Sequence, residues 1–89
     1  MSSWRVETSS EFDRSLRRLD HAAAVRVVNY LRALLELDDP RQRGRGLSAN
    51  RAGFWRYRVG DYRILAEIRD DRLVVIALDV AHRSTAYDA

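Results

Sequence analysis

The sequence contains no cysteine, no lysine and only one proline in 89 residues. Without cysteine it can form neither a disulfide nor a thiolate site for a metal ion, and two histidines are too few for a zinc site without help from carboxylates. No apolar run approaches the roughly 20 residues that a membrane-spanning helix needs, and residues 1–7 lack the apolar core of a signal peptide. We therefore expect a cytoplasmic protein with no cofactor, no metal and no membrane partner.

The absence of lysine makes all sixteen basic residues arginine, the better bidentate ligand for phosphate. Residues 41–63 hold seven of these arginines against a single acid, Asp61, and so carry a charge of +6. Residues 1–40 and 64–89 carry charges of −1 and −2. A GC-rich genome would favour arginine codons without clustering them, so the cluster indicates a phosphate-binding surface.

The chain begins with the pattern of a strand followed by a short helix. Residues 4–8 alternate between apolar and polar, as in a half-buried strand. Thr8 and Glu11 match a capping box, and Ser9 and Ser10 are alternative N-caps for the helix that follows.

Asp20 can cap a second helix, which ends before Pro40. Its predicted apolar stripe is Val25, Val28, Leu31, Leu34 and Leu35. The two helices are expected to form a hairpin that covers one face of a sheet. Residues 40–53 then form a long loop rich in arginine and glycine, and such loops are usually functional or mobile.

Three further strands are predicted at 54–59, 62–68 and 73–81, the first two joined by a two-residue turn. In the last strand, one of the two faces carries Asp79, so the other face is expected to be the buried one. This choice of face requires an odd number of residues in the loop before the strand. The side chains then expected to face the core are Trp55, Tyr57, Val59, Tyr62, Ile64, Ala66, Ile68, Val74, Ile76, Leu78 and Val80.

Together these elements predict one α+β domain over residues 1–89. The expected sheet is small, twisted, mostly antiparallel and four-stranded, with the N-terminal helical hairpin packed on one face. The order along the chain is β-α-α-β-β-β.

The turn at Gly60 pairs Arg58 directly with Arg63 across the ladder. Like charges about 5 Å apart on a sheet are destabilising, and a phosphate between them would relieve the repulsion. Strand parity places Arg56 and Arg83 on the same face. The four arginines therefore predict an anion site, although solvated charges on an open sheet face are the alternative.

Two residues beside this face suggest chemistry. His82 is a histidine, the residue type whose side chain ordinarily changes charge near neutral pH. Tyr87 lies four residues beyond Arg83. Either could move a proton or stack on a base during metal-free RNA cleavage. Equally, His82 could be a structural hydrogen-bonding residue and Tyr87 a packing anchor. The arginines expected to form a basic loop that holds RNA are Arg41, Arg43, Arg45 and Arg51.

Residues 56–65, the apolar strand after them, His82-Arg83 and Tyr87 resemble the C-terminal half of the RelE/ParE toxin superfamily. The resemblance implies a toxin of a type II toxin–antitoxin system, with a cognate antitoxin as its protein partner. RelE-like members cut mRNA in the ribosomal A site without a metal and leave a 2′,3′-cyclic phosphate. ParE-like members inhibit DNA gyrase instead.

By this resemblance, Arg63 and Arg83 would stabilise charge on the scissile phosphate, and Arg56 and Arg58 would bind the RNA backbone. Arginine holds its proton, so His82, Tyr87 or the ribosome would transfer protons. The sequence thus favours a ribosome-dependent endoribonuclease with mRNA and ribosomal RNA as partners. A gyrase inhibitor and a non-toxic RNA-binding module remain the alternatives.

Overall fold

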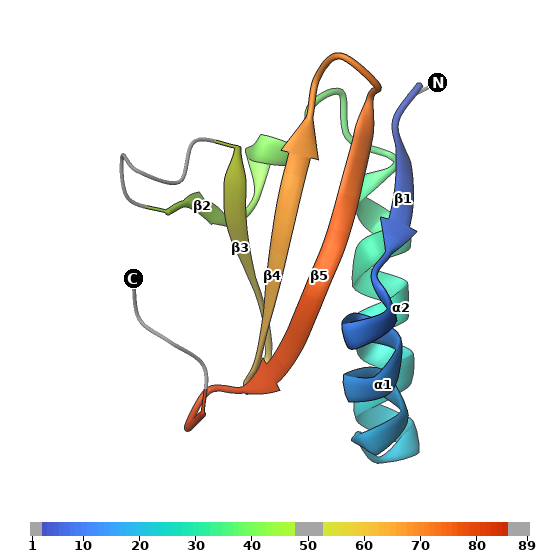
Figure 1. Ribbon diagram of the computed structural model, residues 1–89, viewed down its shortest axis with the longest axis vertical. Helices are drawn as coiled ribbons and strands as arrows, with labels where there is room; N and C mark the ends of the chain where they lie inside the picture. Colours follow the sequence, from blue (N-terminus) through green and yellow to red (C-terminus); the bar gives the residue numbers. More distant parts are fainter. Residues whose placement is uncertain (1–2, 48–52, 86–89) are drawn as a thin grey trace.

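The computed structural model describes residues 3–47 and 53–85, which form two helices, a short 3-10 helix and one sheet (Figure 1). The elements are β1 (Arg5–Thr8), α1 (Ser10–Arg18), α2 (His21–Leu34), η1 (Pro40–Gln42), β2 (Arg45–Gly46), β3 (Phe54–Val59), β4 (Tyr62–Arg69) and β5 (Val74–His82). Figure 1 shows α1 and α2 together on one side of β5. Among the described residues, no helix is long and apolar enough to cross a membrane.

The sheet has five strands in the order β1-β5-β4-β3-β2. The α+β class is confirmed, but the predicted four-stranded sheet is wrong. The fifth strand, β2, lies inside the predicted loop and pairs with β3 over only two residues, too few to give an alternating pattern in the sequence. β1 runs parallel to β5, so the sheet is mixed. The long connection that a parallel pair requires is the whole chain between them, which contains both helices and the other three strands.

Local capping fixes where both helices begin. The N-cap of α1 is Ser9, whose Oγ accepts a hydrogen bond from Phe12 N at 3.0 Å; Thr8 instead belongs to β1. Ser9 Oγ also donates to the carbonyl of Leu78 on β5, at 2.7 Å. Asp20 caps α2 as predicted, because its carboxylate accepts from Ala23 N.

The buried stripe of α2 differs from the predicted one. It consists of Ala23, Val27, Leu31 and Leu34. Val25 is 41% exposed because it lies two positions before Val27, on a different face of the helix. The buried stripe begins with an alanine, Ala23. The prediction used only large apolar residues, and it therefore placed the buried face at the wrong angle around the helix.

All seven residues of the β3–β4 hairpin that were predicted to face the core do so. Four belong to the buried core cluster, and the other three, Trp55, Val59 and Tyr62, pack against it. In the β5 set, Val74 is buried as predicted, although it lies outside the main core cluster, and the next two positions are wrong. The loop between β4 and β5 has an even number of residues, so Val75 and Ala77 enter the core instead of Ile76 and Leu78. A register shift at Leu78 then inserts one residue, and Val80 faces the core as predicted.

The bulge is also where α1 attaches to the sheet. Besides the bond from Ser9, Ser15 Oγ of α1 donates to the Asp79 carboxylate at 2.6 Å. Asp79 next to the bulge is thus half-buried with a polar partner, which is why the strand can carry an acid there.

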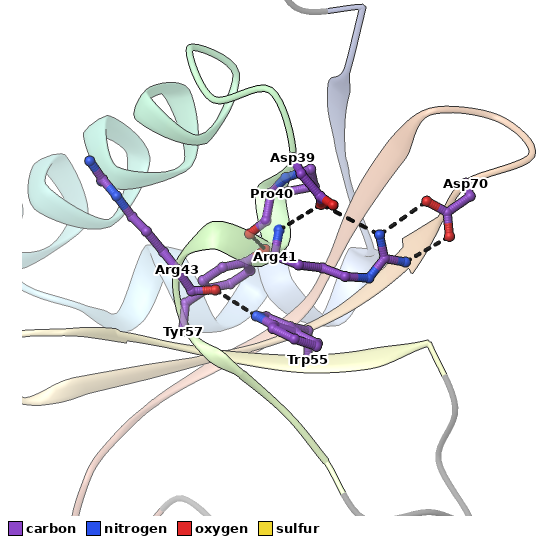
Figure 2. Close-up of polar contacts among 7 residues, drawn as sticks. All are labelled: Asp39, Pro40, Arg41, Arg43, Trp55, Tyr57 and Asp70. Atoms are coloured by element: carbon purple, nitrogen blue, oxygen red, sulfur yellow. Dashed lines mark hydrogen bonds and ion pairs between the residues drawn. The ribbon is translucent and has the colours of Figure 1, made fainter.

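Three side-chain contacts fasten residues 39–43 to the sheet (Figure 2). The buried hydroxyl of Tyr57 donates to the carbonyl of Pro40 at 2.8 Å, and Trp55 Nε1 donates to the carbonyl of Arg43 at 2.7 Å. Arg41 donates to both carboxylate oxygens of Asp70, at 3.0 and 2.7 Å. This bidentate pair raises the pKa of Arg41 and lowers that of Asp70. The loop that precedes β2 is therefore held in one place.

Replacement of Ser9 by alanine tests the cap. Ser9→Ala removes the oxygen that accepts from Phe12 N and the donor to Leu78, and should lower the free energy of unfolding by about 1–2 kcal/mol. Urea unfolding followed by circular dichroism measures this. Ser10→Ala is the matched control, since Ser10 is an exposed residue of the first turn; an equal loss in both variants would contradict the assignment of Ser9.

Tyr57→Phe should lower the free energy of unfolding by about 1–2 kcal/mol, because it leaves the Pro40 carbonyl without its buried donor. Burial raises the pKa of Tyr57, so the folded protein keeps this proton after the unfolded chain has lost it. This contribution to stability is complete below about pH 10 and declines as the pH rises further. Unfolding at pH 7 and pH 11 should therefore show a smaller alkaline loss in Tyr57→Phe than in the wild type; equal losses would refute the link.

Candidate anion-binding site

The sheet carries two pairs of arginines in direct register. Arg58 pairs with Arg63 between β3 and β4, as predicted, and Arg45 pairs with Arg56 between β2 and β3. The two pairs lie two residues apart along β3, so their side chains share the sheet face opposite Tyr57 and the core. The second pair was not predicted, because its partner strand was not.

These arginines surround one cavity of about 760 Å³. Its lining is Gly44, Arg45, Arg56, Arg58, Arg63, His82, Arg83 and Ser84. β5 extends to His82, and Arg83 reaches the cavity from its end, as parity predicted. His82 pairs with Tyr62 in the register, so its side chain lies on the opposite face of the sheet. None of the described residues in this lining carries a carboxylate and five carry a guanidinium group, so the cavity attracts anions.

Two arginines of the cavity are oriented by the hairpin turn. Arg63 Nη1 donates to the carbonyls of Gly60 and Tyr62, both at 3.0 Å. Arg83 binds Asp61 twice, since its backbone N–H donates to the Asp61 carbonyl at 2.6 Å and its Nε lies 3.5 Å from the carboxylate. Gly60 makes the turn possible, with a φ of +56°. The turn therefore sets the register and also holds both guanidinium groups.

His82 is fixed at the edge of the cavity. Its ring packs edge-on against Tyr62, with centroids 5.5 Å apart. Its Nδ1 lies 2.9 Å from Ser84 Oγ and accepts a hydrogen bond from Ser84 N at 3.2 Å. The cations of the cavity are therefore its five arginines, an arrangement suited to a phosphate group.

Gly44 lets the loop approach the strand closely. Its φ is +71°, and a Cβ there would collide with the carbonyl of Arg56 and with the rings of Trp55 and Tyr57. Only glycine permits the contact that brings Arg45 beside Arg56.

The loop arginines do not act together. Arg45 lines the cavity, but Arg41 is held by Asp70, and Arg43 lies over the ring of Tyr30 at 5.7 Å from its centroid. Of the predicted loop arginines that the structure describes, Arg45 therefore lies in the cavity, whereas Arg41 and Arg43 contact a carboxylate and an aromatic ring outside it. Two predicted site residues, Arg51 and Tyr87, lie outside the described residues.

Sequence reasoning missed three residues that shape the site. Gly44 carried no pattern that separates it from other loop glycines. Ser84 stands two residues after a histidine, a spacing that allows a local hydrogen bond. Asp61 was assigned only to the turn, although it also pairs with Arg83.

Residues 6–87 match the family model of the ParE toxin of the type II toxin–antitoxin system parDE. No curated protein matches the chain. Several solved structures do, and a chain of the RelBE2 toxin–antitoxin complex from Mycobacterium tuberculosis is 30% identical, with a TM-score of 0.80 over 90% of this chain and 98% of that one.

More distant structures share the fold. A chain of the archaeal RelE–RelB complex from Pyrococcus horikoshii is 21% identical, with a TM-score of 0.71 over 93% of this chain and 98% of that one. A chain of the DinJ–YafQ complex from E. coli is 17% identical, with a TM-score of 0.64 over 96% and 99%. The resemblance noted in the sequence is thereby confirmed, and the chain belongs to the ParE toxin family of type II toxin–antitoxin systems, within the RelE/ParE superfamily.

Proposed function

We propose that this toxin is a ribosome-dependent endoribonuclease that cuts mRNA without a metal ion. The observation that carries the proposal is the cavity, where two arginine pairs in register meet Arg83 and His82. Ladder hydrogen bonds hold these like charges together, and a phosphodiester between them would remove the repulsion.

The chemistry assigned to the cavity is attack of a ribose 2′-hydroxyl on the adjacent phosphorus. The bond to the 5′-oxygen breaks, leaving a 2′,3′-cyclic phosphate and a 5′-hydroxyl. Arg63 and Arg83 stabilise the charge that develops on the phosphate oxygens. Arg45, Arg56 and Arg58 bind the RNA backbone.

The remaining assignments follow from the resemblance. Tyr87 is a candidate for proton transfer or for stacking on a base, and His82 is a second candidate. Ribosomal RNA and mRNA are then the nucleic-acid partners, and the cytoplasm is the place of action. A cognate antitoxin with carboxylates on the segment that covers the cavity would neutralise the toxin, as arginine pairs well with carboxylate. The single domain predicted over residues 1–89 would act as one unit.

The match to the ParE family model favours a second candidate, inhibition of DNA gyrase without nuclease activity. In that case the cavity arginines would contact a protein or DNA and no RNA would be cut.

Expression of the chain from a tightly controlled promoter should arrest growth and produce new 5′ ends within translated mRNA. Arg63→Ala or Arg83→Ala should lower cleavage on isolated translating ribosomes by about 10²–10³-fold, as expected for removal of one group that stabilises the transition state. Arg14→Ala, on the exposed side of α1, is the matched control and should cleave like the wild type. Growth arrest without new 5′ ends, together with inhibited supercoiling by gyrase, would replace this proposal with the second candidate.

The different positions of the loop arginines give a separate prediction. Arg45→Ala should weaken RNA binding and reduce the slope of log affinity against log salt by about 1, because one phosphate contact is lost. Arg43→Ala should leave the slope unchanged, since Arg43 lies over Tyr30 and outside the cavity. Fluorescence anisotropy of a labelled single-stranded RNA at several salt concentrations measures both variants; equal slopes for the two would contradict the assignment.

A further inference from the structure

The two arginine pairs of the cavity stand at a fixed separation along β3. Arg56 and Arg58 lie two residues apart on this strand, and each is in register with an arginine on a neighbouring strand, Arg45 or Arg63. Two residues of a β-strand advance by about 6.5 Å, and strand side chains stand roughly perpendicular to the sheet. The cavity therefore presents two cationic positions, the Arg45–Arg56 pair and the Arg58–Arg63 pair, about 6.5 Å apart along the strand.

This separation matches the spacing of phosphates along a nucleic-acid strand. Consecutive phosphates of a single strand are joined through one sugar and lie about 6–7 Å apart. The two phosphates of a diphosphate share one oxygen and are too close together to reach both pairs. The cavity of about 760 Å³ is as large as sites that hold a whole small molecule, so one phosphate would leave most of it unfilled.

The Arg45–Arg56 pair is built into the fold. The hydroxyl of Tyr57 and the indole of Trp55 fasten the loop that precedes β2. Gly44 then lies so close to the carbonyl of Arg56 that no other residue fits, and the next residue, Arg45, enters the register. Because folding has already ordered this segment, binding of a phosphate to the pair would not have to order it.

A peptide strand with acidic side chains two residues apart would offer a similar spacing, but the surroundings favour a nucleic acid. Strand-like peptides gain affinity from main-chain hydrogen bonds. At Arg56, β3 already pairs with a strand on each side, so a peptide cannot pair with β3 across both positions. Among the described residues that line the cavity there is also no large apolar side chain for a peptide to bury. A sugar–phosphate backbone needs neither kind of contact.

We propose that the cavity binds two consecutive phosphates of one RNA strand, one at each arginine pair. The inference rests on the proposed nuclease function and deepens it. Arg83 is held by Asp61 in the hairpin turn and so joins the Arg58–Arg63 pair. The scissile phosphate, which gains charge in the transition state, belongs at this more cationic position. The Arg45–Arg56 pair then holds the neighbouring phosphate, and the substrate must carry two phosphates joined through one nucleoside.

Small ligands that cannot be cleaved test the spacing. In 2′-deoxyadenosine 3′,5′-bisphosphate the phosphates lie on either side of one sugar, whereas in 2′-deoxyadenosine 5′-diphosphate they are joined directly. Calorimetric titration of the full chain should give a dissociation constant for the bisphosphate that is lower by about tenfold or more, as expected for one further charge-assisted contact. Equal affinities for the two ligands would overturn the inference.

Arg45→Ala tests which pair holds the second phosphate. In about 0.15 M salt, where distant charges are screened, it should weaken the bisphosphate about tenfold and 2′-deoxyadenosine 5′-monophosphate by less than about twofold. Arg43→Ala is the matched control, since Arg43 is an exposed loop arginine outside the cavity, and should leave both affinities unchanged. An equal loss of both ligands in Arg45→Ala would show a general effect of charge and overturn the assignment. If circular dichroism shows that Arg45→Ala has lost its fold, the two ligands on the wild type decide.

The two proposals can fail separately. A preference for the bisphosphate without any cleavage on translating ribosomes refutes the nuclease and supports the two-phosphate site. Cleavage without that preference refutes only the site. A short peptide in which threonine and glutamate alternate tests the other occupant. Weaker binding than the bisphosphate supports the inference, and tighter binding in competition with the bisphosphate would identify a protein strand as the ligand and overturn it.

Discussion

The register between β3 and β4 is the constraint on which the rest of this structure depends. Gly60 closes a two-residue turn, and the ladder that follows places Arg58 opposite Arg63. Backbone hydrogen bonds and the burial of Tyr57 and Ile64 on the other face hold that alignment against the repulsion of the charges. The same turn binds both Arg63 and Arg83. A single local signal in the sequence thus fixes one edge of the cavity and orients two of its guanidinium groups.

The opposite edge depends on contacts between residues far apart in the sequence. Tyr57 and Trp55 bind carbonyls of the loop, and the pair of Arg41 with Asp70 ties that loop to the turn between β4 and β5 (Figure 2). Gly44 then allows the short strand β2 to lie against β3. These contacts explain the division among the loop arginines, because an arginine that anchors the loop is not available to a ligand in the cavity.

The features that could be predicted from the sequence depend on residues close together in the chain, and those that were missed depend on how distant segments pair. The hairpin and its arginine face were predictable, since a two-residue turn determines every cross-strand pair after it. The first half of β5 was not, because residues 74–78 are all apolar and alternation cannot reveal which of them face the core. An even-length loop and a bulge at Leu78 each shift the faces by one residue, and the two shifts cancel before Val80. Arg83 was therefore placed correctly from a register that was wrong farther upstream.

The cavity links binding to stability. Arginines in register repel one another in the free protein, and an anion that binds only the folded state stabilises that state. Each further positive charge would strengthen anion binding and also destabilise the unliganded fold. Under the proposed function, an antitoxin carboxylate and an RNA phosphate would compete for the same guanidinium groups, so occupation by one would exclude the other.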